Sequence, residues 1–136
     1  MIYSVNEESE YYKKARKFIE NKLINDGIAV TDITLIEFFQ VTTNEKVVSN
    51  PFSAEEANGI IQDLLNDPRV ELLQMEENIL KYVFETSKYH KISKYEIYDH
   101  IIANICKFYD VDEFYTLNNH DFDSYDFLTV INPFKI

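Results

Sequence analysis

The sequence predicts a mixed α+β fold with three main helices, two β-hairpins and a C-terminal strand. Two capping boxes, each followed by apolar residues at helical spacing, indicate helices at 53–66 and 94–109. The segments between the helices contain short runs of β-branched and aromatic residues, which are typical of strands. A length of 136 residues with 46% hydrophobic content fits one compact domain, 1–136, with a core of its own.

The first helix is expected at 7–25, where Tyr12, Ala15, Ile19 and Leu23 recur at helical spacing. Gly27 follows these residues and can adopt the left-handed backbone conformation that ends many helices. The helix is locally basic although the whole chain has a net charge of −11, because it carries Lys13, Lys14, Arg16, Lys17 and Lys22.

Residues 28–50 allow two interpretations. The run ITLIEFFQV favours a strand, and TTNE followed by KVV can close a hairpin, so we expect strands here. Alternatively, Thr31 or Asp32 caps a short helix that carries Leu35, Ile36 and Phe39.

The second helix, 53–66, begins with the capping box of Ser53 and Glu56, and Asp67-Pro68 ends it. Two apolar runs, VELLQM and ILKYVF, follow on either side of Glu76-Glu77-Asn78 and predict a hairpin at 70–84.

The third helix, 94–109, begins with a second capping box, formed by Ser93 and Glu96. The run FLTVI predicts the last strand. The apolar stripes of the second and third helices give the expected core residues: Ile60, Ile61, Leu64, Leu65, Ile101 and Ile105.

In element order, the helix 53–66 and hairpin 70–84 resemble the recognition helix and wing of winged-helix domains, over about residues 15–84. A helix that reads DNA needs Arg, Lys, Asn or Gln aimed at base edges. This helix instead carries Glu55, Glu56, Asp63 and Asp67. The resemblance therefore implies a module whose DNA readout is lost or turned toward a protein.

No motif predicts catalysis, a metal or a cofactor. The sequence lacks GxSxG, GxxxxGK[ST], HExxH and GxGxxG, and the spacing of His90, His100 and His120 offers no ligand pair. Asp121, Asp123 and Asp126 resemble the start of a calcium loop, but the required Gly and terminal Glu are missing. The lone Cys106 excludes an internal disulfide and favours the cytoplasm. We therefore expect a protein that is not an enzyme.

The segment from Asp110 to Phe127 concentrates six carboxylates and no Lys or Arg, with aromatic rings between them. Such a surface attracts basic protein grooves and repels phosphate, although it can also serve only as a solvated face. The expected partner-binding residues are Asp110, Asp112, Glu113, Tyr115, Asp121, Phe122, Asp123, Tyr125 and Asp126. A secondary acidic face is expected from Glu55, Glu56, Asp63, Asp67, Glu76 and Glu77.

These observations favour an acidic DNA mimic that inhibits a basic, nucleic-acid-handling protein such as a nuclease by occupying its groove. Phage anti-defence or anti-CRISPR inhibitors and toxin-immunity proteins are the expected kinds. The alternative is a winged-helix-like regulator or assembly module, acting through protein contacts, whose basic first helix lies near nucleic acid. The leading interpretation predicts no direct contact with nucleic acid, because 24 acids outnumber 13 Lys and Arg. No apolar run is long enough to span a membrane.

Overall fold

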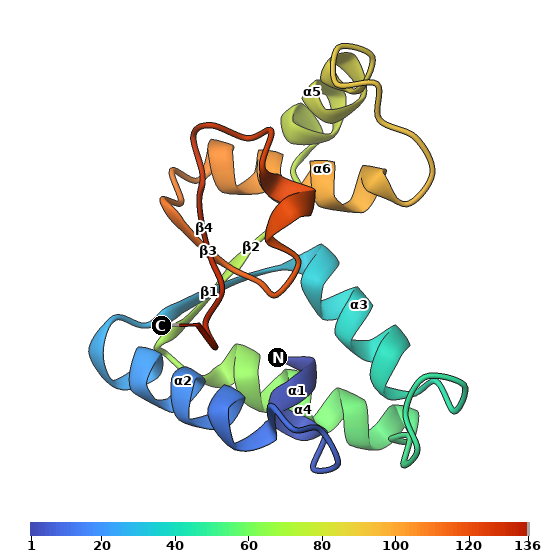
Figure 1. The fold of residues 1–136 in the computed structure, drawn as a ribbon, viewed down its shortest axis with the longest axis vertical. Coiled ribbons are helices and arrows are strands. Elements are labelled where there is room, and N and C mark those ends of the chain that lie inside the picture. The colour runs from blue at the N-terminus through green and yellow to red at the C-terminus, as the bar shows by residue number, and fades with distance from the viewer. Residues whose placement is uncertain (136) are drawn as a thin grey trace. The chain divides into compact units, whose positions relative to one another are not determined.

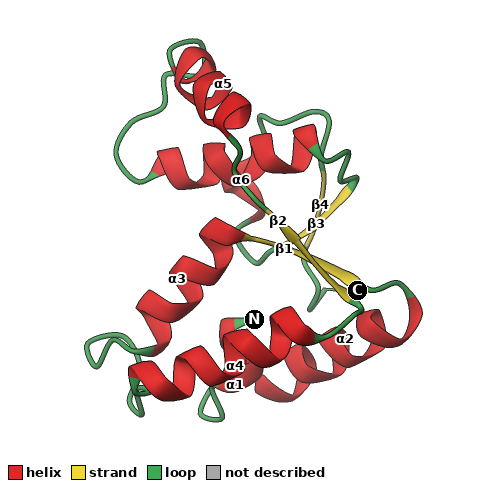
Figure 2. Ribbon diagram, turned by 180° about the vertical axis from the view of Figure 1, so that it is seen from behind, coloured by secondary structure: helices red, strands yellow, loops and turns green. Residues whose placement is uncertain are grey.

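The computed structural model describes residues 1–135 and combines helices with short strands, which is compatible with the predicted α+β class (Figure 2). The chain forms two compact units, Met1–Leu72 and Leu73–Ile136. That the chain is one domain stays a prediction. Within the described part of the chain, no helix is long and apolar enough to cross a membrane.

The first unit is mainly helical (Figure 1). Its elements are α1 (Ile2–Val5), α2 (Tyr12–Asn25), β1 (Ile28–Thr31), α3 (Asp32–Thr42), α4 (Ala54–Asn66) and all but the last residue of β2 (Val70–Leu73), which pairs with β1. The helix expected at 7–25 begins only at Tyr12. Polar side chains cap turns before it: Asn6 Oδ1 accepts from the Glu8 amide at 3.2 Å, and Ser9 Oγ accepts from the Tyr11 amide at 3.1 Å.

Asp32–Thr42 is helical, as the alternative interpretation had it, so the favoured strand interpretation was wrong beyond Thr31. Thr31 caps α3, because its Oγ1 accepts a hydrogen bond from the Thr34 amide at 3.0 Å. Leu35, Phe38 and Thr42 recur at helical spacing and are buried. Burial of this face outweighs the strand preference of the β-branched residues, which is the usual outcome when tertiary packing opposes propensity.

The capping box predicted for the second helix is confirmed in α4. Ser53 Oγ accepts from the Glu56 amide at 3.1 Å, and Glu56 Oε2 accepts from the Ser53 amide at 2.8 Å. The expected core is confirmed at Ile101 and Ile105, which are buried. The four α4 positions are only half-buried, namely Ile60, Ile61, Leu64 and Leu65.

The second unit contains α5 (Glu77–Ser87), α6 (Glu96–Phe108), β3 (Glu113–Tyr115), the 3₁₀ helix η1 (Asn119–Phe122) and β4 (Thr129–Ile131). The predicted C-terminal strand is confirmed as β4, which pairs in parallel with β3 and places Phe114 opposite Val130. Helices α5 and α6 pack against each other.

The hairpin predicted at 70–84 was wrong, because only Val70–Leu73 is a strand and α5 takes up the second apolar run. Ile79 and Val83 lie four residues apart and are both buried, so the run is one face of an amphipathic helix. Without a hairpin after α4, the arrangement on which the winged-helix resemblance rested is absent from residues 1–135.

Helix α6 is the central element of the second unit. It begins at Glu96 rather than at 94, since Lys94 has a φ of 53°, which is not helical. Half of the predicted box is formed, with the Ser93 amide donating to Glu96 Oε2 at 3.0 Å. Seven consecutive residues, from His100 to Cys106, are buried, so this stretch is covered on every side.

Replacement of Gly27 tests the end of α2. Gly27 has a φ of 76°, and an added Cβ would lie 2.9 Å from the carbonyl oxygen of Arg69. We expect Gly27→Ala to lower the free energy of unfolding by about 1–3 kcal/mol, because both the backbone conformation and the contact oppose a side chain.

Gly59→Ala is the matched control, since Gly59 lies within α4 and an added Cβ meets no atom within 4 Å. This change should raise the free energy of unfolding by about 0.4–1 kcal/mol. Urea unfolding of both variants measures the contrast, and equal effects of the two substitutions would contradict the described end of α2.

Candidate functional site

A cluster of polar and aromatic side chains lies in the middle of the second unit. We call it the His100 cluster: Thr86, His90, His100, Asn104 and Tyr125. These residues come from α5, the α5–α6 loop, α6 and the turn after η1. His100 is 0% exposed, Asn104 3% and Tyr125 5%. Buried polar groups of this kind need partners within the protein.

Hydrogen bonds link the cluster into a chain with one direction. Thr86 Oγ1 lies 2.8 Å from the carbonyl oxygen of Tyr82, to which it donates its only proton. Thr86 Oγ1 must then accept from His100 Nε2, which lies 3.0 Å away. The other ring nitrogen, Nδ1, therefore carries no proton in a neutral imidazole, and it accepts from the Tyr125 hydroxyl at 2.8 Å. The geometry assigns His100 as the neutral Nε2–H tautomer.

Stacked rings continue the cluster toward the surface. The exposed ring of His90 lies 5.7 Å from that of Tyr125 with an interplanar angle of 26°, and 5.3 Å from that of His100. Asn104 closes the inner side, donating from Nδ2 to the carbonyl oxygen of His100 at 2.7 Å. The α5–α6 loop is thereby attached to the core through His90.

Burial shifts the acid–base behaviour of the cluster. It lowers the pKa of His100, and the neighbouring His90 lowers this pKa further. Burial also raises the pKa of Tyr125 to about 12, assisted by the carboxylates of Asp99 and Glu96. Both groups are therefore neutral near pH 7, which matches the hydrogen-bond chain.

Two carboxylates lie in the first turn of α6, near the Tyr125 hydroxyl. Glu96 is exposed, and one of its oxygens accepts from the Ser93 amide. Asp99 is half-buried. Negative charge is favourable at this end of a helix because the first amides of the helix point toward it. No group of three His, Cys, Asp or Glu residues that could hold a metal ion occurs within residues 1–135.

The acidic tail separates into exposed carboxylates and buried rings. Tyr115 is half-buried, whereas Phe122 and Tyr125 are buried, and Phe122 packs on Phe114 with ring centroids 4.7 Å apart. The rings thus support the second unit. The carboxylates are all exposed, namely Asp110, Asp112, Glu113, Asp121, Asp123 and Asp126. That these carboxylates contact a protein partner stays a prediction.

The expected secondary acidic face is divided between the units. Glu55, Glu56, Asp63 and Asp67 belong to the first unit, and Glu76 and Glu77 to the second. Several of these carboxylates form local interactions within the chain. Arg69 binds Asp67 at 2.7 Å and lowers the pKa of that carboxyl to about 2. Glu56 completes the α4 capping box, and Glu77 pairs with Lys81.

The sequence interpretation missed the buried role of His100, because it considered the three histidines only as metal ligands. Its position offered a clue, since His100 falls among the apolar positions of α6 with Asn104 one turn later. Cys106 is a buried residue of α6. It is 2% exposed, and burial raises the pKa of its thiol to about 11, which makes it a poor nucleophile.

The buried neutral His100 predicts a dependence of stability on pH. Its folded pKa lies below the ordinary value of 6.5, so below pH 6.5 the unfolded chain takes up a proton that the folded chain does not. Its contribution is complete above pH 6.5 and is lost as the pH falls toward the folded pKa. As the pH falls below 6.5, this residue should lower the free energy of unfolding, with a slope that approaches about 1.4 kcal/mol per pH unit.

Urea unfolding at several pH values between about 5.5 and 7.5 measures this slope, in a range above the ordinary titration of carboxylates. His100→Gln should flatten it, whereas the control His120→Gln, at a side chain that is 98% exposed, should leave it. An unchanged slope in His100→Gln would contradict the neutral, buried imidazole.

Comparison with known proteins shows a similarity that spans almost the whole chain. Ribonuclease VapC24 of Mycobacterium tuberculosis, from strain CDC 1551 / Oshkosh and from strain ATCC 25618 / H37Rv, is 25% identical over 133 residues. The match covers 98% of this chain and 91% of the relative in each case. No family model matches the chain.

This similarity contradicts the interpretation of the chain as a non-enzymatic acidic inhibitor. A relative that is named for catalysis and matches end to end overturns the DNA-mimic, anti-CRISPR and immunity-protein predictions, and the regulator alternative with them. Those predictions were wrong because neither net charge nor the absence of short motifs excludes catalysis. The chain is similar to a ribonuclease throughout its length.

Proposed function

We propose that this protein is a ribonuclease that cleaves phosphodiester bonds in RNA. The similarity to ribonuclease VapC24 carries the proposal, because it covers 98% of this chain and 91% of the relative. A match of that extent includes the elements of both units rather than one shared helix or loop.

Asp99 is our candidate for the catalytic carboxylate. It lies in the first turn of α6, close enough to the buried Tyr125 hydroxyl for its charge to raise that pKa. The neighbouring Glu96 is less suitable, since it is exposed, whereas Asp99 is half-buried, where water screens a charge less. The packing of α6 and the His100 chain hold the Asp99 backbone in place, which is what a reacting group needs.

The chemistry open to Asp99 is that of a carboxylate. It can accept a proton from the attacking oxygen, or it can hold a divalent cation, which in phosphate chemistry needs only one or two protein carboxylates besides the substrate. A cation of that kind would stabilise the charge that develops on the phosphate oxygens. The measured effect of chelation distinguishes these two roles.

The proposed activity changes the expectation about nucleic acid. The sequence interpretation predicted no direct contact with nucleic acid, whereas the proposed activity makes RNA the substrate. A cleavage assay decides between these two expectations. A cytoplasmic location fits the proposal, since RNA is present there and the lone Cys106 favours a reducing compartment.

Cleavage of a fluorescently labelled single-stranded RNA tests the proposal. We expect the wild-type chain to produce fragments, and Asp99→Asn to slow cleavage by about 10²–10⁴-fold, the range for loss of a positioned acid or base. Reactions with excess EDTA and with added Mg²⁺ show whether a cation takes part.

Asp63→Asn is the matched control, because Asp63 is exposed on α4 and the substitution makes the same change of charge. Both variants must show the helical circular dichroism of the wild type. Equal cleavage by wild type and Asp99→Asn would remove Asp99 from the mechanism. Absence of cleavage by wild type across single-stranded and structured RNAs, with and without Mg²⁺, would refute the ribonuclease assignment.

A further inference from the structure

The α5–α6 loop is a basic, aromatic exception within an acidic chain. Residues 88–95 read KYHKISKY and contain three lysines and no carboxylate, while the whole chain has a net charge of −11. The rings at its two ends face solvent, with Tyr89 71% exposed and Tyr95 83% exposed. The loop therefore combines exposed aromatic rings with cations within eight residues.

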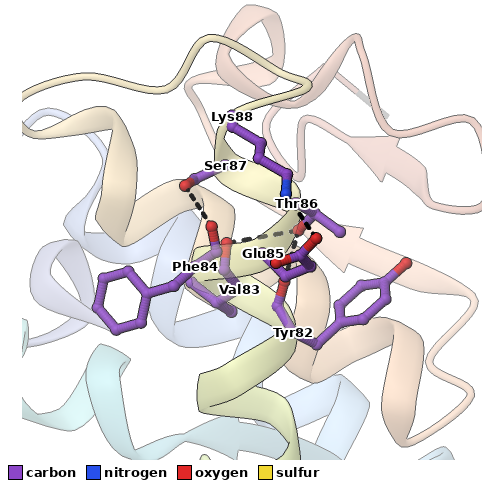
Figure 3. Close-up of polar contacts among 7 residues, drawn as sticks. All are labelled: Tyr82, Val83, Phe84, Glu85, Thr86, Ser87 and Lys88. Atoms are coloured by element: carbon purple, nitrogen blue, oxygen red, sulfur yellow. Dashed lines mark hydrogen bonds and ion pairs between the residues drawn. The ribbon is translucent and has the colours of Figure 1, made fainter.

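The cations at the centre of the loop are available to a ligand. Lys91 and Lys94 are exposed and form no ion pair with any carboxylate of residues 1–135. Lys88 pairs with Glu85, a residue of the last turn of α5 (Figure 3), and its Nζ lies 2.6 Å from Glu85 Oε1. The same Nζ lies 5.1 Å from the centroid of the Tyr89 ring. Such an exposed pair stabilises a fold little, so a phosphate can replace Glu85 as the partner of Lys88.

The nearest carboxylates on either side of the loop have local partners. Glu85 is the partner of Lys88, and Glu96 accepts from the Ser93 amide. Charges more than about 8 Å away are largely screened at physiological salt. A phosphate within this distance of Lys91 and Lys94 is attracted by both cations.

The loop is also held in one conformation. The Ile92 amide donates to the Ser87 carbonyl at 3.0 Å, which closes the end of α5 with Lys91 in the left-handed region at a φ of 52°. His90 stacks on Tyr125 and fixes the middle of the loop to the His100 cluster. A surface ordered in advance binds at a lower entropic cost.

We propose that residues 88–95 bind single-stranded RNA, with bases stacked on Tyr89 and Tyr95 and phosphates held by Lys91 and Lys94. Single-strand binding surfaces combine these two features, a cationic track and aromatic platforms. The choice of RNA rests on the ribonuclease function proposed above. The loop is the surface that holds the substrate strand, and it is distinct from the candidate catalytic residue Asp99.

Binding is measured by fluorescence anisotropy with labelled RNA and DNA of the same sequence, each about 12 nucleotides long, which is about one binding site. Probes are checked on a gel after each titration so that cleavage is not mistaken for weak binding. The two probes separate binding from activity, because stacking and phosphate contacts are common to both nucleic acids.

Lys91→Asn/Lys94→Asn removes both cations while asparagine tolerates the left-handed conformation of these positions. We expect binding at about 0.05 M salt to weaken at least about tenfold, and the slope of log K against log salt to fall by about 1.4, which is about 0.7 for each phosphate that the lysines no longer neutralise. Tyr89→Ala and Tyr95→Ala should each weaken binding at least about fivefold and leave the slope unchanged.

Matched controls lie outside the loop. Lys13→Gln/Lys17→Gln removes two exposed cations of α2, and Tyr98→Ala removes a ring of α6 that is 53% exposed. Both should retain affinity within about twofold. All variants must melt within a few degrees of the wild type.

Three results would overturn the proposal. Loop variants that bind like the wild type would remove the loop from the interface, and a loss of affinity confined to the α2 variant would place binding on that helix. A change from dimer to monomer in Lys91→Asn/Lys94→Asn, without a change in nucleic-acid affinity, would show that the loop meets an acidic second copy.

Loop-dependent binding without cleavage would refute the ribonuclease function alone, whereas cleavage with unaltered binding in the loop variants would refute only this inference.

Discussion

The complete burial of α6 from His100 to Cys106 is the constraint on which the second unit depends. A helix covered on every side needs partners around its whole circumference, and α5 and η1 supply contacts from different parts of the chain. Burial also brings two polar side chains inside, His100 and Asn104. Their polar groups must be paired within the protein, because a buried group without a partner costs about 1–3 kcal/mol.

The hydrogen-bond chain through His100 meets that requirement and orders the surface above it. Thr86 and Tyr125 saturate both ring nitrogens, so the imidazole joins α5, α6 and the turn after η1. The stacking of His90 on Tyr125 extends this order to the loop that bears the exposed lysines and tyrosines. A core contact thus determines where the loop presents its charges and rings.

The overall charge was a poor guide to function because electrostatic effects in salt solution are local. A net charge of −11 describes the chain as a whole, but a ligand responds mainly to charges within about 8 Å of its binding position. Residues 88–95 carry three lysines and no carboxylate, and the carboxylates nearest to them in sequence, Glu85 and Glu96, have partners within the protein. An acidic protein can therefore present a surface suited to RNA.

Local patterns in the sequence determined the features that depend on adjacent residues. These are the start of α4 at its capping box, the end of α2 before Gly27, and the final strand β4. Only the tertiary structure decided whether two apolar runs are helix or strand, since ITLIEFFQV and ILKYVF contain β-branched and aromatic residues that suit strands. They became α3 and α5 because their buried residues, such as Ile79 and Val83, share one helical face. The His100 cluster was equally hidden, because hydrogen bonds between residues 14 and 25 positions apart depend on how α5, α6 and the C-terminal turn pack.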